Sequence, residues 1–208
     1  MILAIESSTP KGGLALLDPE TDEVVFERGF QSDRAHNSVI FEPLEAALDS
    51  VEAKPSLIVV GTGPGSYGGV RVGIAVANAL SVAFNAQVIG LPSICALETD
   101  VDDYLVAGDA RRNSFYIATI QNRQLQAAPE VFDPDEFTQT ITNSQLPVLS
   151  TDPKPPHGLE VIALTKPNAL QLARLAVNAE IVNRPIEPLY IREPYITTPK
   201  RRGATIST

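Results

Sequence analysis

The glycine-rich segment is the part of this sequence whose residue types are best suited to chemistry. Six of the thirteen glycines fall within residues 61–73, directly after the apolar run Leu57–Val60. A strand, a glycine loop and a helix in succession direct backbone N–H groups and a helix N-terminus toward an anion. Gly63, Gly65 and Ser66 are therefore candidate contacts for a phosphate or another anion.

The same loop has a purely structural interpretation. It lacks the Gly-Lys-Ser or Gly-Lys-Thr of a phosphate-binding P-loop. Residues 63–68 satisfy the pattern G-x-G-x-x-G, but this pattern is weak evidence without a βαβ context. The alternative is a tight turn that brings the following helix close to the sheet, and the loop alone leaves both interpretations open.

Two further turns carry polar side chains. Ser8 and Thr9 follow the apolar run that ends at Glu6, so their hydroxyls are candidates to hold a phosphate while Glu6 positions a metal or water. Asp109 lies in a turn between two expected strands and is a candidate to face a cleft. In both places ordinary turn chemistry is the simpler alternative, because Ser, Thr and Asp favour turns.

The sequence predicts no metal site and no catalytic residue. A metal-binding pair on one helix face needs a second histidine three or four residues from the first. The two histidines are His36 and His157, and the positions after His36 at that spacing hold Val39 and Ile40. Cys95 is the only cysteine, and its apolar surroundings predict a core position.

Hydrophobic periodicity predicts an α/β fold with two lobes. Residues 1–98 are expected to form the first lobe, residues 99–196 a smaller second lobe, and residues 197–208 a flexible tail or a basic contact strip. The strands expected in the first lobe are 2–6, 14–17, 23–28, 57–60 and 87–91, with helices over 38–51 and 70–84. In the second lobe they are 104–107, 115–120, 148–149 and 161–164, with helices over 134–140 and 168–179. Residues 189–191 could pair with either lobe.

Composition excludes some partners. The 208 residues carry a net charge of −9, whereas a direct nucleic-acid binder presents a basic surface to the phosphates. The first residues run directly into a strand pattern and lack the charged start of a signal peptide. The longest apolar stretch, Gly73–Phe84, is short for a membrane span. We expect no membrane contact and a cytoplasmic location.

Taken in order, several motifs resemble one family, the TsaB (YeaZ) family of tRNA threonylcarbamoyladenosine biosynthesis. The motifs are residues 2–9, His36, residues 63–73, residues 109–112 and residues 188–192. The resemblance implies the fold of the actin, hexokinase and Hsp70 ATPases (the ASKHA fold), with two RNase-H-like lobes of which the second is reduced. It also implies a non-catalytic relative of the enzyme TsaD, with no activity of its own.

The resemblance further implies the partners. They are a TsaD-like catalytic subunit, a TsaE-like ATPase and, indirectly, the tRNA whose adenosine 37 is modified. ATP or ADP and a metal would be held mainly by the partner, and the resemblance permits a homodimer when that partner is absent. The implied interface involves His36 and the two first-lobe helices, at positions Ile40, Leu44, Leu48, Val70, Arg71, Ile74, Ala77, Asn78 and Ser81.

Two departures from the family pattern bear on these implications. Glu6 stands where the family usually has Asp, and Gly68 where it usually has Thr. A free-standing ATPase or phosphotransferase of the same fold is the alternative, with Glu6 and Asp109 as its metal-positioning carboxylates. A metallopeptidase of the glycoprotease (M22) type is the third hypothesis, which two distant histidines hardly support.

Overall fold

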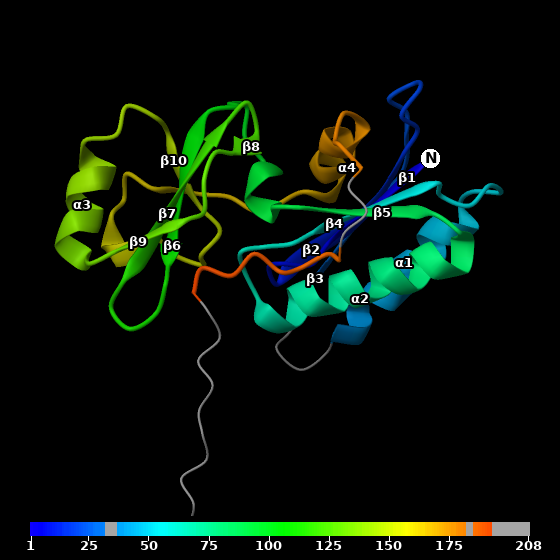
Figure 1. Ribbon diagram of the computed structural model, residues 1–208, viewed down its shortest axis with the longest axis horizontal. Coiled ribbons are helices and arrows are strands. Elements are labelled where there is room, and N and C mark those ends of the chain that lie inside the picture. Colours follow the sequence, from blue (N-terminus) through cyan, green and yellow to red (C-terminus); the bar gives the residue numbers. More distant parts are fainter. Residues whose placement is uncertain (32–36, 182–184, 193–208) are drawn as a thin grey trace, which may run out of the picture.

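The computed structural model describes residues 1–31, 37–181 and 185–192. They form two α/β lobes side by side, each built on its own sheet (Figure 1). The strands are β1 (Ile2–Glu6), β2 (Lys11–Leu17), β3 (Val24–Gln31), β4 (Leu57–Gly61), β5 (Gln87–Leu91), β6 (Tyr104–Asp109), β7 (Phe115–Gln121), β8 (Gln124–Leu125), β9 (Glu130–Phe132), β10 (Val148–Ser150) and β11 (Ala163–Leu164). The α-helices are α1 (Phe41–Asp49), α2 (Tyr67–Phe84), α3 (Pro134–Thr142) and α4 (Ala169–Val177), with 3-10 turns at Asn37–Ile40, Ser93–Cys95 and Pro156–Gly158.

The first sheet has the strand order β3-β2-β1-β4-β5. Strands β1, β2 and β3 form an antiparallel meander, and β1, β4 and β5 run parallel. Successive side chains of a strand point to opposite faces of the sheet. Leu3 and Ile5 pack under α1 and α2, whereas Ile2 and Ala4 pack under α4 on the other face. Helices on both faces explain why β1 is apolar until its last residue.

Helix α2 begins three residues before the position predicted from its apolar pattern. The Ser66 side chain accepts a hydrogen bond from the Gly69 amide and caps the helix at its N-terminus. By length and composition α2 is the one described helix that could span a membrane. Its apolar character has another explanation, since Val70, Ile74 and Ala77 pack in the core of the first lobe.

The helix expected over 38–51 is shorter and starts with a 3-10 turn. Regular α-helix spans Phe41–Asp49, with Pro43 in its first turn. Proline has no backbone N–H, so Pro43 cannot donate to the carbonyl four residues earlier, and it is tolerated only near a helix start. Position 43 therefore fixes where the regular helix can begin.

The second sheet has the order β11-β10-β6-β7-β8, with β9 paired to β7, and α3 packs on it. The four strands predicted in this lobe are confirmed, and β8 and β9 were not predicted. Strand β8 follows a two-residue turn at Asn122 and Arg123, both with left-handed backbone. Two consecutive left-handed residues form the turn type favoured in tight hairpins.

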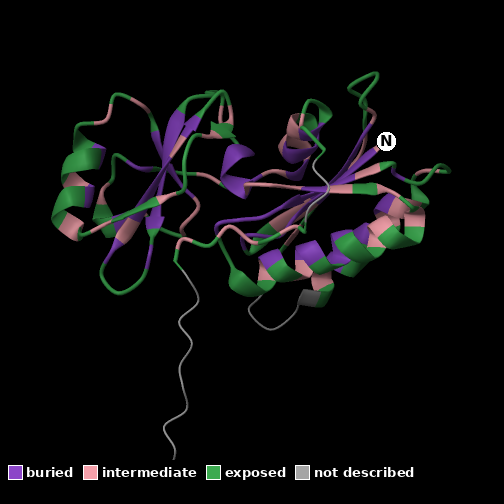
Figure 2. Ribbon diagram, viewed as in Figure 1, coloured by how far each residue is buried: buried purple, intermediate pink, exposed green. Residues whose placement is uncertain are grey.

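Helix α4 packs on a different lobe from the one that the sequence predicts for it. It lies within residues 99–196, the predicted second lobe, yet it packs against β1 and β2 of the first sheet. Figure 2 shows its buried side facing that sheet. The chain therefore crosses between the lobes more than once, because a second apolar face of the first sheet needs a cover. The predicted tail 197–208 lies outside the described residues.

Candidate functional site

The glycine loop is packed tightly against the turn between β1 and β2. The Ser66 amide donates to the Ser8 carbonyl at 2.6 Å, and the Ser7 hydroxyl donates to the Gly69 carbonyl at 2.9 Å. A Cβ atom on Gly65 would overlap the Ser8 carbonyl, and one on Gly69 would overlap the Ser7 carbonyl. These glycines therefore let two backbones approach, which is the structural interpretation of the motif.

Most of the candidate anion contacts are covered in this arrangement. Ser8 and Gly63 are buried, and Thr9 is 9% exposed. Gly65 and Ser66 remain exposed, but the Ser66 side chain is engaged in capping α2. Five of the six candidates thus gather at one place in the first lobe, and only two of them face solvent. Anion binding at this loop stays a prediction.

Asp109, the sixth candidate, lies in the other lobe at the end of β6. Its carboxylate accepts a hydrogen bond from the Arg111 amide at 2.7 Å and pairs with the Arg111 guanidinium at 3.2 Å. Its own amide donates to the Asp152 carboxylate at 2.8 Å. Burial raises the pKa of Asp152. Asp109 therefore has a defined role in its turn, which is the simpler alternative for this residue.

Glu6 forms a buried polar centre beneath the glycine loop. Its carboxyl group is fully buried, and the Ser8 amide donates to one oxygen at 2.6 Å. The other oxygen and the Ser8 hydroxyl are buried without a hydrogen-bond partner among the described residues. Gly61 makes room for this carboxyl, because a Cβ there would overlap it. The sequence placed Glu6 at a strand end facing a metal or water, whereas the structure covers it.

A pH dependence follows from the burial of Glu6. Desolvation by burial raises the pKa of Glu6, so the folded state holds this proton more tightly than the unfolded chain does. The stabilisation that the protonated carboxyl provides is fully present below the unfolded pKa, near 4.5, and is lost as the pH rises through the folded pKa. A Glu6→Gln variant is neutral at every pH and lacks this loss.

We therefore expect Glu6→Gln to gain stability relative to the parent chain as the pH rises above about 4.5. Urea denaturation of both proteins across this range measures the difference. Glu20→Gln, at an exposed turn, is the matched control and should show no such trend. A difference between Glu6→Gln and the parent that stays constant with pH would contradict the assignment.

The candidate interface residues on α1 and α2 divide into two groups. Ile40, Leu44, Val70, Ile74 and Ala77 are buried in the core of the first lobe. Their side chains pack inside the lobe, and a contact between these residues and a partner stays a prediction. The helical periodicity by which these residues were selected indicates the apolar side of each helix that packs on the sheet.

The other described interface candidates are less covered, although Leu48 also packs against the core of the first lobe. Arg71 and Asn78 are exposed, and Leu48 and Ser81 are half-buried. His36 lies outside the described residues. Figure 2 shows α2 with buried and exposed positions in alternation along its length.

The structure shows exposed residues of α2 that the sequence interpretation missed. Ala75 and Val82 are exposed, and with Arg71 and Asn78 they recur every three or four positions along one side of α2. Val82 is 84% exposed, the largest value among the exposed large hydrophobic residues. We call Arg71, Ala75, Asn78 and Val82 the α2 face. A second set of positions with helical spacing, beside the core stripe, is the signal that could have identified it.

Two remaining sequence predictions concern metal ligands and the cysteine. Within residues 1–31, 37–181 and 185–192 the structure brings together no group of three or more His, Cys, Asp or Glu side chains suited to a metal ion. Cys95 is buried, as predicted, and burial raises the pKa of its thiol to about 11. It is therefore a core residue and not a reactive thiolate.

Comparison with known proteins agrees with this architecture. The family model described as TsaD, tRNA N6-adenosine threonylcarbamoyltransferase, matches residues 30–184. An uncharacterized protein of Mycobacterium tuberculosis is 30% identical over 93% of this chain and 92% of its own length. The tRNA threonylcarbamoyladenosine biosynthesis protein TsaB of Bacillus subtilis is 32% identical over 58% of this chain and 55% of its own length.

Solved structures show the same fold. YeaZ from Pseudomonas aeruginosa has a TM-score of 0.68 at 24% identity, covering 84% of this chain and 90% of that one. A second structure, titled an uncharacterized protein with similarity to peptidase YeaZ from Pseudomonas aeruginosa, has a TM-score of 0.70 at 22% identity, covering 92% and 99%. The fold and the glycine loop define a two-lobed α/β protein of the TsaD type. The chain belongs to the TsaD family and, within it, to the TsaB (YeaZ) group.

Proposed function

We propose that this chain is a non-catalytic subunit that binds a TsaD-type enzyme and supports threonylcarbamoyl transfer to adenosine 37 of tRNA. Membership of the TsaB group supports the pathway. The observation that carries the binding role is the α2 face, an exposed row of two apolar and two polar residues along one side of the helix. In this proposal the partner binds to the α2 face.

The chemistry of the α2 face suits a helix of a partner protein. Ala75 has a small side chain, and the neighbouring Ala79 is also exposed, so another backbone can approach closely. Val82 supplies apolar area, and Arg71 and Asn78 supply hydrogen-bond donors. Phe41 on α1 is 54% exposed. It adds a second exposed apolar side chain on the face of the first sheet that α1 and α2 cover. Without the enzyme, the same face would pair with a second copy of this chain.

A supporting role without catalysis is also part of the proposal. The carboxyl group of Glu6, which the ATPase alternative needs at a cleft, is fully buried, and Asp109 is occupied by its own turn. ATP or ADP and a metal would be held by the partner enzyme. The net charge of −9 supports contact with tRNA through the partner and not through this chain. Recruitment of a TsaE-like ATPase would be a property of the assembled pair, in the cytoplasm.

Reconstitution tests this function. The TsaD-type enzyme and the remaining synthesis proteins of the same genome are combined with unmodified tRNA, ATP, threonine and bicarbonate, with and without this chain. Modified nucleoside is measured by mass spectrometry after digestion of the tRNA. We expect modification that depends on adding this chain, and none from this chain without the enzyme. Equal modification in its absence would contradict the supporting role.

A further inference from the structure

The segment that follows α4, residues 185–192, contains no helix or strand and yet contacts both lobes. In Figure 1 it is the orange to red stretch that passes from the first lobe toward the second. We call residues 185–192 the strap. Residues 188–192, one of the motifs that carry the family resemblance, form its C-terminal part.

The first half of the strap is anchored in the first lobe. Ile186 packs against the apolar core there and lies over Gly90 of β5, where a Cβ atom would collide with its side chain. The Leu189 amide donates to the Thr62 carbonyl at 2.8 Å. Thr62 belongs to the glycine loop, so this hydrogen bond ties the strap directly to the loop.

The strap also covers part of the glycine loop. Gly63 is buried and has a left-handed backbone, and the Leu189 carbonyl lies 3.6 Å from the position its Cβ would take. One residue further, the Tyr190 ring stacks on Tyr67 at the start of α2, with 5.9 Å between ring centroids. The strap thus contacts both ends of the segment between β4 and α2.

The second half of the strap is anchored in the other lobe. Ile191 packs against the core cluster that contains Tyr104 and Tyr116. The Arg192 guanidinium donates to the Ser114 hydroxyl at 2.6 Å, and this hydroxyl donates to the Arg111 carbonyl at 2.7 Å. Residues 111–113 all have left-handed backbone, a conformation that non-glycine residues adopt only when their surroundings hold them. Arg192 therefore reinforces a strained turn from across the boundary between the lobes.

We propose that the strap is a latch that holds the two lobes in one relative position and keeps the glycine loop covered. Five contacts support it, three on the first lobe and two on the second, made within seven residues. The lobes are thereby fixed by the chain itself and need no ligand between them. This property is independent of the proposed function, because it concerns the chain alone.

Hydrogen–deuterium exchange of the full chain tests the latch. The double variant Tyr190→Ala, Arg192→Ala removes the ring stacking and the second-lobe hydrogen bond while leaving Ile186 in place. We expect exchange about fivefold faster or more at amides 62–69 and 109–115, with amides of β1 and β4 unchanged. The matched control is Arg174→Ala, which breaks an ion pair with Asp22 away from the strap and should change neither segment.

Unchanged exchange in both segments of the double variant would overturn the latch. If the double variant does not fold, the single variant Arg192→Ala removes only one hydrogen bond. The latch then predicts faster exchange at amides 109–115, and an unaltered rate there would overturn it equally.

Discussion

A Val82→Glu variant is expected to lose affinity for the TsaD-type partner by roughly 30-fold or more, while its stability stays close to that of the parent chain. Val82 is 84% exposed, so a charged side chain at this position costs the isolated chain little. In a complex formed through the α2 face, the carboxylate would be buried in an apolar contact without a partner. Burial of an unpaired charge is among the most destabilising changes that an interface can undergo.

The matched control for this prediction is Val161→Glu. Val161 is 65% exposed and lies in the second lobe, close to β11 and away from α2. The same change in charge there should leave affinity for the partner unaltered. Isothermal titration calorimetry with the enzyme measures both variants. Equal affinities for Val82→Glu and Val161→Glu would show that the α2 face is not the contact surface.

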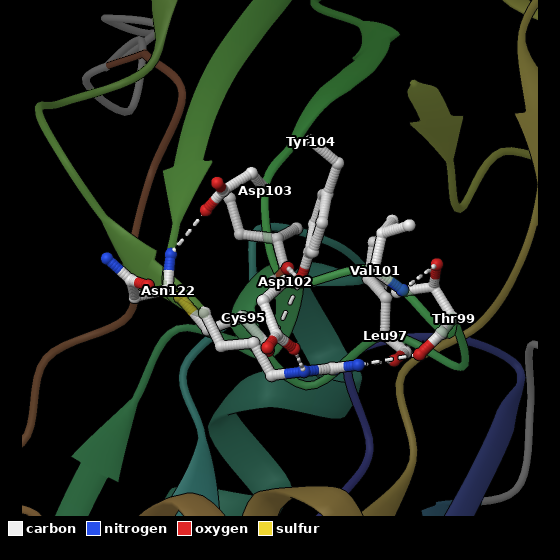
Figure 3. Close-up of polar contacts among 10 residues, drawn as sticks. Cys95, Leu97, Thr99, Val101, Asp102, Asp103, Tyr104 and Asn122 are labelled. Atoms are coloured by element: carbon white, nitrogen blue, oxygen red, sulfur yellow. Dashed lines mark hydrogen bonds and ion pairs between the residues drawn. The ribbon is translucent and has the colours of Figure 1, made fainter. Parts of the chain in front are cut away.

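We expect an Arg123→Met variant to be less stable than the parent chain, with a free energy of unfolding lower by about 3 kcal/mol. The Arg123 guanidinium donates to the Leu97 carbonyl at 3.1 Å, to the Thr99 carbonyl at 2.6 Å and to the Asp102 carboxylate at 2.7 Å. Figure 3 shows these three acceptor residues. These acceptors lie on the linker between the lobes, and the Arg123 side chain is 12% exposed. Arg123 therefore holds the linker against the turn between β7 and β8.

The magnitude depends mainly on the two carbonyl groups. Asp102 is 68% exposed, so solvent weakens its ion pair with Arg123 and this part contributes little. Methionine has a similar length but no hydrogen-bond donor. It leaves both partly buried carbonyls without a partner, and an unpaired buried carbonyl destabilises the folded state. Arg123→Lys keeps the charge but cannot donate in three fixed directions, so we expect an intermediate loss.

Urea denaturation followed by circular dichroism measures these variants. Arg174→Met is the control, since Arg174 makes an exposed ion pair with Asp22 and its side chain is 44% exposed. We expect a change there of about 0.5 kcal/mol or less. A loss in Arg123→Met that is no greater than in Arg174→Met would mean that the linker is held by other contacts.

Local patterns allowed most elements to be predicted. The strand Gln87–Leu91 has the predicted bounds, and α3 begins at the predicted Pro134, where the Asp133 side chain accepts hydrogen bonds from the first turn. These features depend on neighbouring residues, which the sequence contains directly. Features that depend on distant residues were harder to predict. Arg123 contacts a segment more than twenty positions earlier, and nothing in its own surroundings indicates this.

The candidate site shows the same limit. The helical pattern of α2 identified a stripe that includes Ile74 and Ala77, but a pattern alone does not say whether that stripe meets the sheet or a partner. The structure assigns it to the core and leaves Ala75 and Val82 exposed. Likewise Glu6 stands at a strand end in the sequence, and only the packing of the glycine loop over it shows that it is covered.

Light scattering behind size exclusion, on this chain alone and mixed with the TsaD-type enzyme of the same genome, tests the central claim most directly. The proposal predicts that the mixture elutes as a complex with one copy of each protein, in place of any homodimer of this chain. Two separate peaks with the masses of the individual proteins, with ATP and the TsaE-like protein also present, would contradict it.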